Sequence, residues 1–270
     1  MACPVRTRSL LLFSLLLGCP SPAAAQGPPL PAAGAAEVRP LSAAASAATA
    51  GSPSEGLRLD PKELQQLTGL PPAPGSSALS DDLAVLRWLQ ANRTPQMVAT
   101  TWTLLGRDVD QFSPALGVDM SKTTPQLNRG LQAFLALVDQ AGNGIKDLVR
   151  RPRPYWSHAD LKPCLPPEAG FSFPSGHSSW YAAASRLLAD LMPERRERLL
   201  EIGQHGGTSR VLCGVHYPSD VLAAQRFGSA AAARIISSPQ WQRFRSDPAI
   251  VSELAAVRAA RPEALPLLVR

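Results

Sequence analysis

The stretch FSFPSGHSSWYAAASRLLADL, residues 171–191, joins a Pro-Ser-Gly turn to a run with helical texture that begins near residue 178. Serine at such a turn is typical of a helix start, because its side chain accepts a hydrogen bond from a free N–H group of the first turn. Three further helical stretches follow, near 194–210, 219–236 and 249–260. No alternation of apolar and polar residues reaches a useful length, so the sequence predicts an all-α fold.

Upstream of this stretch, the same periodicity predicts three more helices. Ser80 is the candidate N-cap of the first, Pro95 begins the second and Pro125 begins the third. At helical spacing, the rings of Trp102 and Trp180 are expected to pack in the core rather than bind a ligand. We therefore expect a single-domain bundle of six or more helices. The apolar faces of the three upstream helices hold, in turn, Leu83, Leu86 and Leu89; Val98, Trp102, Leu105 and Val109; and Leu127, Leu131, Phe134 and Val138.

The first 25 residues have the three parts of a bacterial export signal. Arg6 and Arg8 supply positive charge, residues 10–17 form an apolar run, and alanines at 23–25 form a small-residue cleavage site. An apolar run of about eight residues is far shorter than the roughly 20 that span a bilayer, which argues against a membrane anchor. The sequence therefore predicts a signal peptide at 1–25 and a periplasmic or secreted protein.

Residues 16–19, LLGC, leave a second kind of processing open. They resemble the box at which bacterial lipoproteins are cleaved and acylated on a cysteine, although Leu17 is a poor fit to it. A lipid anchor at Cys19 is therefore the alternative to a soluble mature chain. Mass spectrometry of the mature amino terminus distinguishes the two.

Residues 26–74 have the composition of a disordered linker. From Pro20 to about Asp60, Ala, Pro, Ser and Gly dominate and no aromatic residue occurs, so little apolar area is available to offset the conformational entropy of folding. The predicted domain covers 75–270. No apolar run after the leader is long enough to span a membrane, and the nearest, 227–236, contains Arg234, so no integral membrane segment is expected in the mature chain.

Charge and cysteine usage narrow the partners and the compartment. The formal net charge is +6, and two of the arginines lie in the leader, so about +4 remains after export, which does not favour nucleic acid as a partner. Cys164 and Cys213 are the only cysteines beyond the leader. An even pair in an oxidising compartment predicts a disulfide, with two separate buried thiols as the alternative.

Three short groups of residues contain the candidate chemistry. The first is Lys146 followed after six residues by Arg153 and Pro154, the second is the tetrapeptide PSGH at 174–177, and the third spans 209–220. So many specified positions at fixed spacing are not expected by chance. The specified positions of the third group are Ser209, Arg210, His216 and Asp220.

Together these groups suit the binding of a phosphate ester. Such an ester carries about −1.5 to −2 charges near neutral pH, and Lys146, Arg153 and Arg210 offer three positive charges with donors suited to phosphate oxygens. Ser175 adds a hydroxyl donor, and the missing Cβ of Gly176 lets backbone N–H groups approach an anion at the start of a helix. The turn alone would indicate only a helix cap, whereas beside the other two groups it indicates a phosphate site.

Two of the four histidines occupy positions in these groups. His216 and Asp220 lie four residues apart, so on a helical turn the carboxylate can accept a hydrogen bond from Nδ1 and leave Nε2 free to attack phosphorus. Pro218 lies between them, which places this turn at the beginning of a helix. We expect His216 to be the nucleophile, Asp220 to orient it, and His177 to protonate the departing alcohol. The other two histidines are expected at the surface or behind the site.

Taken together, these residues resemble the pattern of the phosphatidic acid phosphatase type 2 superfamily, which also includes the vanadium haloperoxidases. Within it, segments 164–179 and 203–220 look like the bacterial class A non-specific acid phosphatases. Phe173 and Ser178 stand where that group usually has Tyr and Thr, which leaves the catalytic positions intact. The resemblance implies an all-α, metal-independent, exported phosphomonoesterase that works through a phosphohistidine, often as a homo-oligomer, and that vanadate inhibits.

The expected mechanism makes two further claims. It needs His216 neutral and His177 protonated, so the rate should have a bell-shaped pH dependence with an optimum on the acid side. The cations take the electrostatic role of a metal, and the sequence contains no close set of Cys, His and carboxylates with ligand spacing. We therefore expect no cofactor, no metal and full turnover in excess chelator.

Three alternatives use many of the same residues. A vanadium haloperoxidase would hold vanadate with them, but the domain is short for that group. A periplasmic lipid phosphate phosphatase would prefer lipid phosphates over nucleotides by a wide margin. A phosphate-binding protein without turnover would need the cations alone, and the presence of His177, His216 and Asp220 argues against it.

Overall fold

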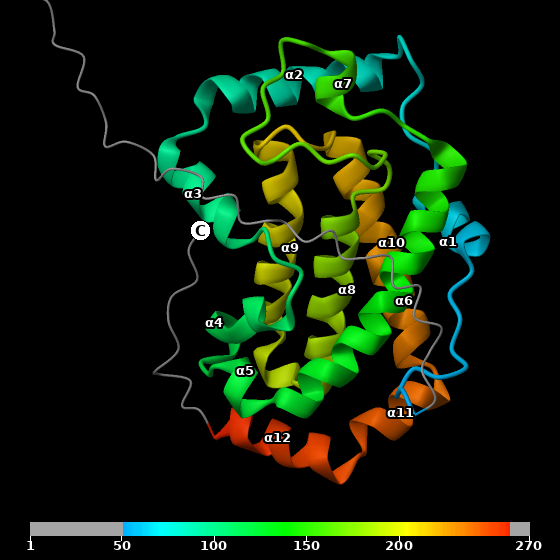
Figure 1. The fold of residues 1–270 in the computed structure, drawn as a ribbon, viewed down its shortest axis with the longest axis vertical. Coiled ribbons are helices and arrows are strands. Elements are labelled where there is room, and N and C mark those ends of the chain that lie inside the picture. The colour runs from blue at the N-terminus through cyan, green and yellow to red at the C-terminus, as the bar shows by residue number, and fades with distance from the viewer. Residues whose placement is uncertain (1–50, 260–270) are drawn as a thin grey trace, which may run out of the picture. The chain divides into compact units, whose positions relative to one another are not determined.

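The computed structural model describes residues 51–259, and every regular element in that range is a helix (Figure 1). The expected all-α fold is confirmed. The predicted signal peptide, Cys19 and residues 26–50 of the predicted linker lie outside the described residues. The helices are α1 (Pro61–Thr68), α2 (Ser77–Asn92), α3 (Pro95–Thr103), η1 (Val109–Phe112), α4 (Ser113–Leu116), α5 (Met120–Thr123), α6 (Pro125–Val149), α7 (Pro154–Ser157), α8 (Gly176–Leu191), η2 (Pro193–Arg195), α9 (Arg196–Leu212), α10 (Pro218–Ile236), α11 (Pro239–Arg245) and α12 (Pro248–Arg258).

Prolines begin many of these helices. A proline stands in the first turn of α1, α3, α6, α10, α11 and α12, where its fixed φ suits the helix and its missing N–H is not needed. The predicted starts at Pro95 and Pro125 are confirmed. The predicted cap Ser80 is wrong, because the hydroxyl of Ser76 accepts the hydrogen bond from the Leu79 N–H, at 3.2 Å. Several serines in this segment can serve as a cap, and local sequence does not choose among them.

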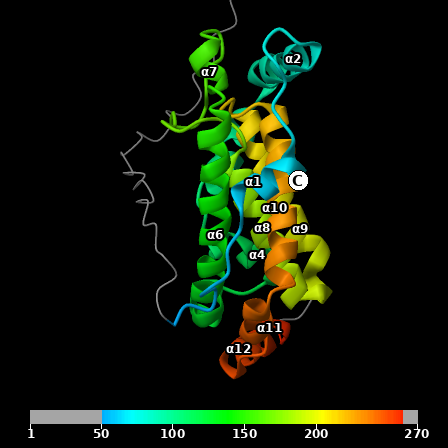
Figure 2. The ribbon, with the colours of Figure 1, turned by 90° about the vertical axis from the view of Figure 1, so that its right-hand side faces the viewer.

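The central helix of the bundle is α8. It packs against α6, α9 and α10, which run alongside it (Figures 1 and 2), and every side chain from residue 178 to 185 is buried. Gly206 of α9 faces the ring of Tyr181, and Gly228 of α10 faces the carbonyl of Ser179. A methyl group at either glycine would overlap its neighbour, so the close approach of these helices depends on the missing Cβ.

The two ends of the bundle have different covers. The short helix α7 and the longer α2 lie at the end where α8 and α10 begin, and α11 and α12 lie at the other end (Figures 1 and 2). The second end contains an aromatic cluster in which Phe134 packs against Trp241 and Phe244, with ring centroids 5.2 and 5.4 Å away. Among the helices described, none is both long enough and apolar enough to cross a membrane.

Part of the predicted linker is folded. Within residues 51–74, α1 packs against α6 and α10 and buries Leu64. Asp60 caps this helix by accepting a hydrogen bond from the Lys62 N–H at 2.8 Å. The linker prediction is therefore wrong for this segment, because a short helix with one buried leucine gains its stability from the domain it packs on rather than from its own composition.

The two predicted core tryptophans have different outcomes. Trp180 is buried as expected, whereas Trp102 is 45% exposed and that expectation is wrong. The helix that contains Trp102, α3, ends at Thr103, so the predicted apolar stripe does not continue. The indole Nε1–H of Trp102 instead donates to the carbonyl of Cys164 at 3.1 Å.

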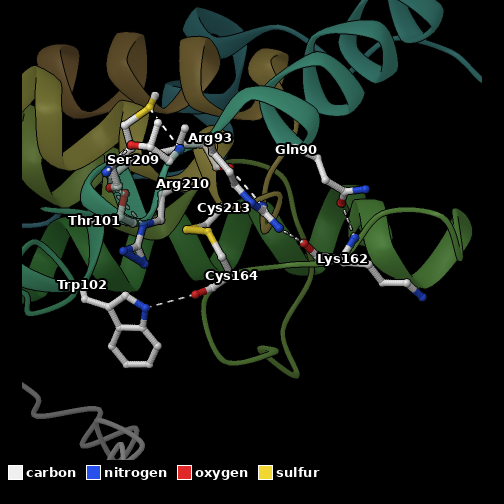
Figure 3. The surroundings of a disulfide bond; sticks show 12 residues. Gln90, Arg93, Thr101, Trp102, Lys162, Cys164, Ser209, Arg210 and Cys213 are labelled. Carbon is white, nitrogen blue, oxygen red and sulfur yellow. Dashed lines mark hydrogen bonds between the residues drawn. A yellow bond between two sulfur atoms is a disulfide. The ribbon is translucent and has the colours of Figure 1, made fainter. Parts of the chain in front are cut away.

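The predicted disulfide between Cys164 and Cys213 is confirmed (Figure 3). It joins the end of α9 to the loop before α8, with Cα atoms 4.7 Å apart. Figure 3 shows Arg93 reaching the same loop, and its guanidinium donates to the carbonyls of Lys162 and Leu212 at 2.6 and 3.3 Å. The loop that leads into the PSGH segment is therefore held in place at its beginning.

Candidate active site

All the predicted site residues lie at helix ends on the same end of the bundle (Figure 1). This end of the bundle suits an anion for two reasons. Helix N-termini have a partial positive charge and free N–H groups, and the loops between the helices place cationic side chains beside them. The residues that meet here are Lys146 at the end of α6, Arg153 before α7, Ser175, Gly176 and His177 at the start of α8, Arg210 at the end of α9, and His216 and Asp220 at the start of α10.

The chain turns sharply into the site after α6. Arg150 has a left-handed backbone conformation, with φ of 52°, and its N–H caps the helix by donating to the Lys146 carbonyl at 2.8 Å. Pro152 disfavours helical geometry for the residue before it, which keeps the helix from continuing. Arg151 and Arg153 are both buried, and they approach His216 from opposite sides, Arg151 through Asp220 and Arg153 directly.

Every nitrogen of the Arg153 guanidinium has a partner. Its Nε donates to the Gly170 carbonyl at 2.7 Å and its Nη2 to the Glu168 carboxylate at 2.7 Å. Its Nη1 donates to the Val215 carbonyl at 3.0 Å and lies 3.1 Å from Nε2 of His216. Because arginine only donates, this contact makes Nε2 an acceptor and places the imidazole proton on Nδ1.

The Nδ1 side of His216 faces Asp220 and Ser172. Nδ1 lies 3.5 Å from Oδ2 of Asp220 and 3.3 Å from the Ser172 hydroxyl, which itself donates to Oδ2 at 2.5 Å. Asp220 therefore contacts His216 as predicted, but the shorter path runs through Ser172. Burial, together with Arg153 nearby, lowers the pKa of His216 to about 4, so the ring is neutral above that pH.

Asp220 is anchored by a second buried arginine and by a backbone N–H group. Arg151 donates to its Oδ1 at 2.6 Å and to Asp82 at 3.2 Å, and the Tyr217 N–H donates to its Oδ2 at 2.9 Å. Burial alone would raise the pKa of Asp220, but hydrogen bonding to His216 and the charge of Arg151 lower it. Arg151 thus positions the carboxylate that contacts His216.

Arg210 is the exception among the buried arginines. Its side chain is fully buried, and its Nη1 and Nη2 have no hydrogen-bond partner within the described part of the chain. Burial lowers its pKa to about 10, which still leaves it protonated at any pH where the protein would work. A buried cation with unpaired donors is costly unless an anion compensates it, so this arginine is suited to bind an anion.

The start of α8 lies against two further cations. A methyl group placed on Gly176 would lie 4.0 Å from Cε of Lys146 and 3.8 Å from Nη1 of Arg107. Lys146 donates to the Phe171 carbonyl at 2.6 Å, and burial together with Arg153 lowers its pKa to about 7. The Ser175 hydroxyl caps α8 by accepting from the Ser178 N–H at 3.4 Å, and its own proton can still be donated. The helix N-terminus and these side chains form a cradle for an anion.

Comparison with known proteins identifies this arrangement. Residues 130–244 match the model of the PAP2 superfamily. The chain is 30% identical over 192 residues to a non-specific acid phosphatase of Providencia stuartii, an overlap of 67% of this chain and 77% of that protein. This chain belongs to the PAP2 superfamily.

Two further known proteins are similar to shorter parts of the chain. A lipid A 1-phosphatase of Rhizobium johnstonii is 36% identical over 91 residues, which are 32% of this chain and 37% of that protein. A transmembrane PAP2 type phosphatidylglycerolphosphate phosphatase from Bacillus subtilis is similar in structure, with a TM-score of 0.48, 22% identity, and coverage of 64% of this chain and 92% of that one.

His177 of this PAP2 site has a different environment from the one that its expected role requires. The imidazole Nε2–H donates to the Leu105 carbonyl at 2.9 Å. Burial, followed by the charges of Arg210 and Arg107, lowers the pKa of His177 well below its ordinary value. The predicted role needs a histidine with an ordinary pKa that keeps its proton, whereas burial and these cations favour the neutral ring.

Three residues of the site were not predicted. Arg107 follows α3 far upstream of the first motif, pairs with Asp139 at 2.7 Å, and no local pattern marks it. Ser172 lies two residues before the PSGH segment, and nothing in the local sequence indicates that it contacts His216. Glu168 pairs with Arg153 from a loop whose course follows only from the fold. In residues 51–259, no group of three or more His, Cys, Asp or Glu side chains is placed to hold a metal ion.

Proposed function

We propose that this PAP2 protein is a metal-independent acid phosphatase that hydrolyses phosphate monoesters through a phosphohistidine on His216. Family membership and the similarity to non-specific acid phosphatases make it a phosphoric monoester hydrolase. The observation that carries the proposal is the fully buried side chain of Arg210, whose two terminal nitrogens are unpaired and whose pKa is affected by Arg153. A tetrahedral dianion supplies the charge and the acceptors that this group lacks.

In the first step, Nε2 of His216 attacks phosphorus as the bond to the ester oxygen breaks. The ring is neutral and its proton is on Nδ1, where Ser172 and Asp220 hold it, so the lone pair is on Nε2. That lone pair accepts from Nη1 of Arg153, and this N–H has to turn to a phosphoryl oxygen before Nε2 can attack. The positive charge that develops on the imidazole is then stabilised by the Asp220 carboxylate. In the second step, water attacks phosphorus as the bond between phosphorus and Nε2 breaks, the electron pair of that bond returns to Nε2, and both protons of the water leave with the phosphate as H₂PO₄⁻, so His216 is neutral again.

The leaving oxygen needs a proton, which we assign to His177. Because burial and nearby cations lower the pKa of His177, the monoanion of the ester is the form that brings this proton into the site. The second pKa of such an ester is about 6, so the supply of protons falls above that pH. We therefore expect turnover to be highest at acidic pH, where the ester is a monoanion.

The cations stabilise the charge that spreads over the phosphoryl oxygens in the transition state. Arg210 has two unpaired terminal nitrogens, and hydrogen bonds to the loop hold Lys146 and Arg153 in a site where burial strengthens electrostatic interactions. Phosphoryl transfer needs this positioning more than it needs covalent assistance.

The Cys164–Cys213 disulfide supports our proposal that the protein is exported to an oxidising compartment.

A second candidate function is hydrolysis of a lipid phosphate, which the similarity of about a third of the chain to lipid A 1-phosphatases favours. The two candidates share the same chemistry and differ in the alcohol. Assays with p-nitrophenyl phosphate, a nucleoside monophosphate and a short-chain lipid phosphate separate them. A preference for the lipid phosphate by two orders of magnitude or more would replace the broad-specificity proposal.

The experiment that tests the mechanism is trapping of the intermediate. Rapid quenching with a labelled ester should leave acid-labile label on the peptide that contains His216, both with and without excess chelator. His216→Ala should lose the label and about 10⁴-fold or more in turnover, whereas His205→Ala, on α9 outside the site, should keep both. Label that persists in His216→Ala would place the covalent step elsewhere.

A further inference from the structure

The loop between the disulfide and the PSGH segment is held at successive points by the site itself. Arg153 binds the Gly170 carbonyl and Lys146 binds the Phe171 carbonyl, at 2.7 and 2.6 Å. The Ser172 N–H donates to the Arg151 carbonyl at 2.8 Å. Side chains that project from this loop therefore have defined positions relative to the phosphate-binding cations.

Glu168 is held more tightly than the rest of the loop. The Tyr155 hydroxyl accepts a hydrogen bond from the Glu168 N–H at 2.9 Å and donates to the Glu168 carbonyl at 3.1 Å. This double contact fixes the backbone from which the side chain projects. The carboxylate then reaches Nη2 of Arg153 at 2.7 Å.

The Glu168 carboxylate lies at the rim of the site and stays charged. Its side chain is 36% exposed, whereas that of Arg153 is 2% exposed, so the pair spans from solvent to the buried cradle. Burial alone would raise the pKa of Glu168, but Arg153, His216, His177 and Arg210 together lower it to about 2. The carboxylate contacts one terminal nitrogen of Arg153 and Nε2 of His216 contacts the other, so Glu168 lies one guanidinium away from the proposed nucleophile.

We propose that Glu168 is a specificity-determining residue that selects phosphate monoesters by the charge of their alcohol part. This inference rests on the proposed phosphatase function. With the phosphoryl group on the buried cations, the alcohol part extends toward the exposed rim, where a fixed carboxylate attracts a positive charge or an N–H donor and repels a negative charge. Esters of amino alcohols are the favoured class, and esters with a second acidic group are disfavoured.

The proposal is distinct from a purely structural ion pair. If Glu168 only held Arg153 in place, its loss would weaken the binding of every phosphate ester by the same factor. A charge that faces the alcohol part instead changes the ratio between substrates that differ in that part alone. The ratio of kcat/KM values is therefore the informative measurement.

The test compares Glu168→Gln and Glu168→Lys with the intact protein. The substrates are phosphoethanolamine, glycerol 2-phosphate and 3-phosphoglycerate, assayed at one acidic pH where their phosphoryl groups carry similar charge. We expect the preference for phosphoethanolamine over 3-phosphoglycerate to fall about tenfold in Glu168→Gln and to fall further in Glu168→Lys. Glu194→Gln is the matched control, because Glu194 also pairs with an arginine, Arg258, at 2.9 Å and is 41% exposed.

The possible outcomes separate this inference from the function on which it rests. An equal loss for all three substrates, or an unchanged ratio in both Glu168 variants, would overturn the role in specificity while hydrolysis itself stands. A chain that hydrolyses none of the three, and shows no label on His216, would instead remove the proposed function. A shifted ratio in Glu194→Gln would show that the effect comes from overall charge and would also overturn the inference.

Discussion

The two ends of α8 are buried to the same degree and have opposite chemistry. Toward its C-terminus, α8 is surrounded by apolar side chains such as Leu187 and Leu188, and the neighbouring aromatic rings fill the space between helices. At its N-terminus it meets buried Arg153, Arg210 and Asp220. Burial therefore does not distinguish the core from the site in this protein. The presence of buried donors without a hydrogen-bond partner does.

Within the site, the same distinction separates two arginines. Arg151 has a carboxylate on each side and an aromatic ring, that of Tyr217, 3.8 Å from its guanidinium. Arg210 has unpaired terminal nitrogens. The first arginine is part of the scaffold, like the core, and the second is held in a costly state that only an anion relieves. The predictions below test this division.

The largest expected effect is on catalysis, from Arg210→Met. We expect kcat/KM to fall about 10⁴-fold, because a fixed donor to the transferred phosphoryl group is lost. The free energy of unfolding should stay the same or rise by about 1–3 kcal/mol, because an uncompensated buried charge is replaced by an apolar side chain of similar length. Denaturant unfolding and steady-state kinetics on the same preparation measure both. A loss of stability as large as the loss of activity would place Arg210 in the scaffold and break the comparison.

The next effect is on stability, from Arg151→Met. This change leaves Asp220 and Asp82 buried without their shared cation, so the free energy of unfolding should fall by about 3–5 kcal/mol. Arg210→Met serves as the matched control, since it removes the same side chain from a buried position nearby. Equal stability changes in the two variants would contradict the assignment of Arg151 to the scaffold.

The smallest effect is the pH dependence of kcat/KM. Below about pH 4, the folded-state pKa of His216, the ring becomes protonated and the rate should fall about tenfold per pH unit. Above the second pKa of the ester, about 6, the monoanion disappears and the rate should fall again. Esters with a lower second pKa should shift the alkaline limb alone. An alkaline limb that is independent of the ester would mean that His177 carries its own proton, as the sequence alone suggested.

Much of the fold and most of the site follow from local chemistry. Apolar periodicity predicts α6, α8, α9, α10 and α12, and the three motifs contain the residues that meet at the helix ends. The sequence predictions are wrong where several neighbouring residues could cap the same helix, or where a helix is stabilised by packing on a distant part of the chain. Ser76 rather than Ser80 caps α2, and α1 folds because the domain provides a surface for Leu64.

The electrostatic behaviour of the site has a different origin. Side-chain type and spacing identify His177, His216 and the cations, since these are properties of short segments. The protonation of His177, the pairing of Arg153 with Glu168 and the isolation of Arg210 arise from distances between segments far apart in the chain. Coulombic interactions and solvent exclusion depend on those distances, so only the folded arrangement of the helices sets which charges are paired and which one remains to bind an anion.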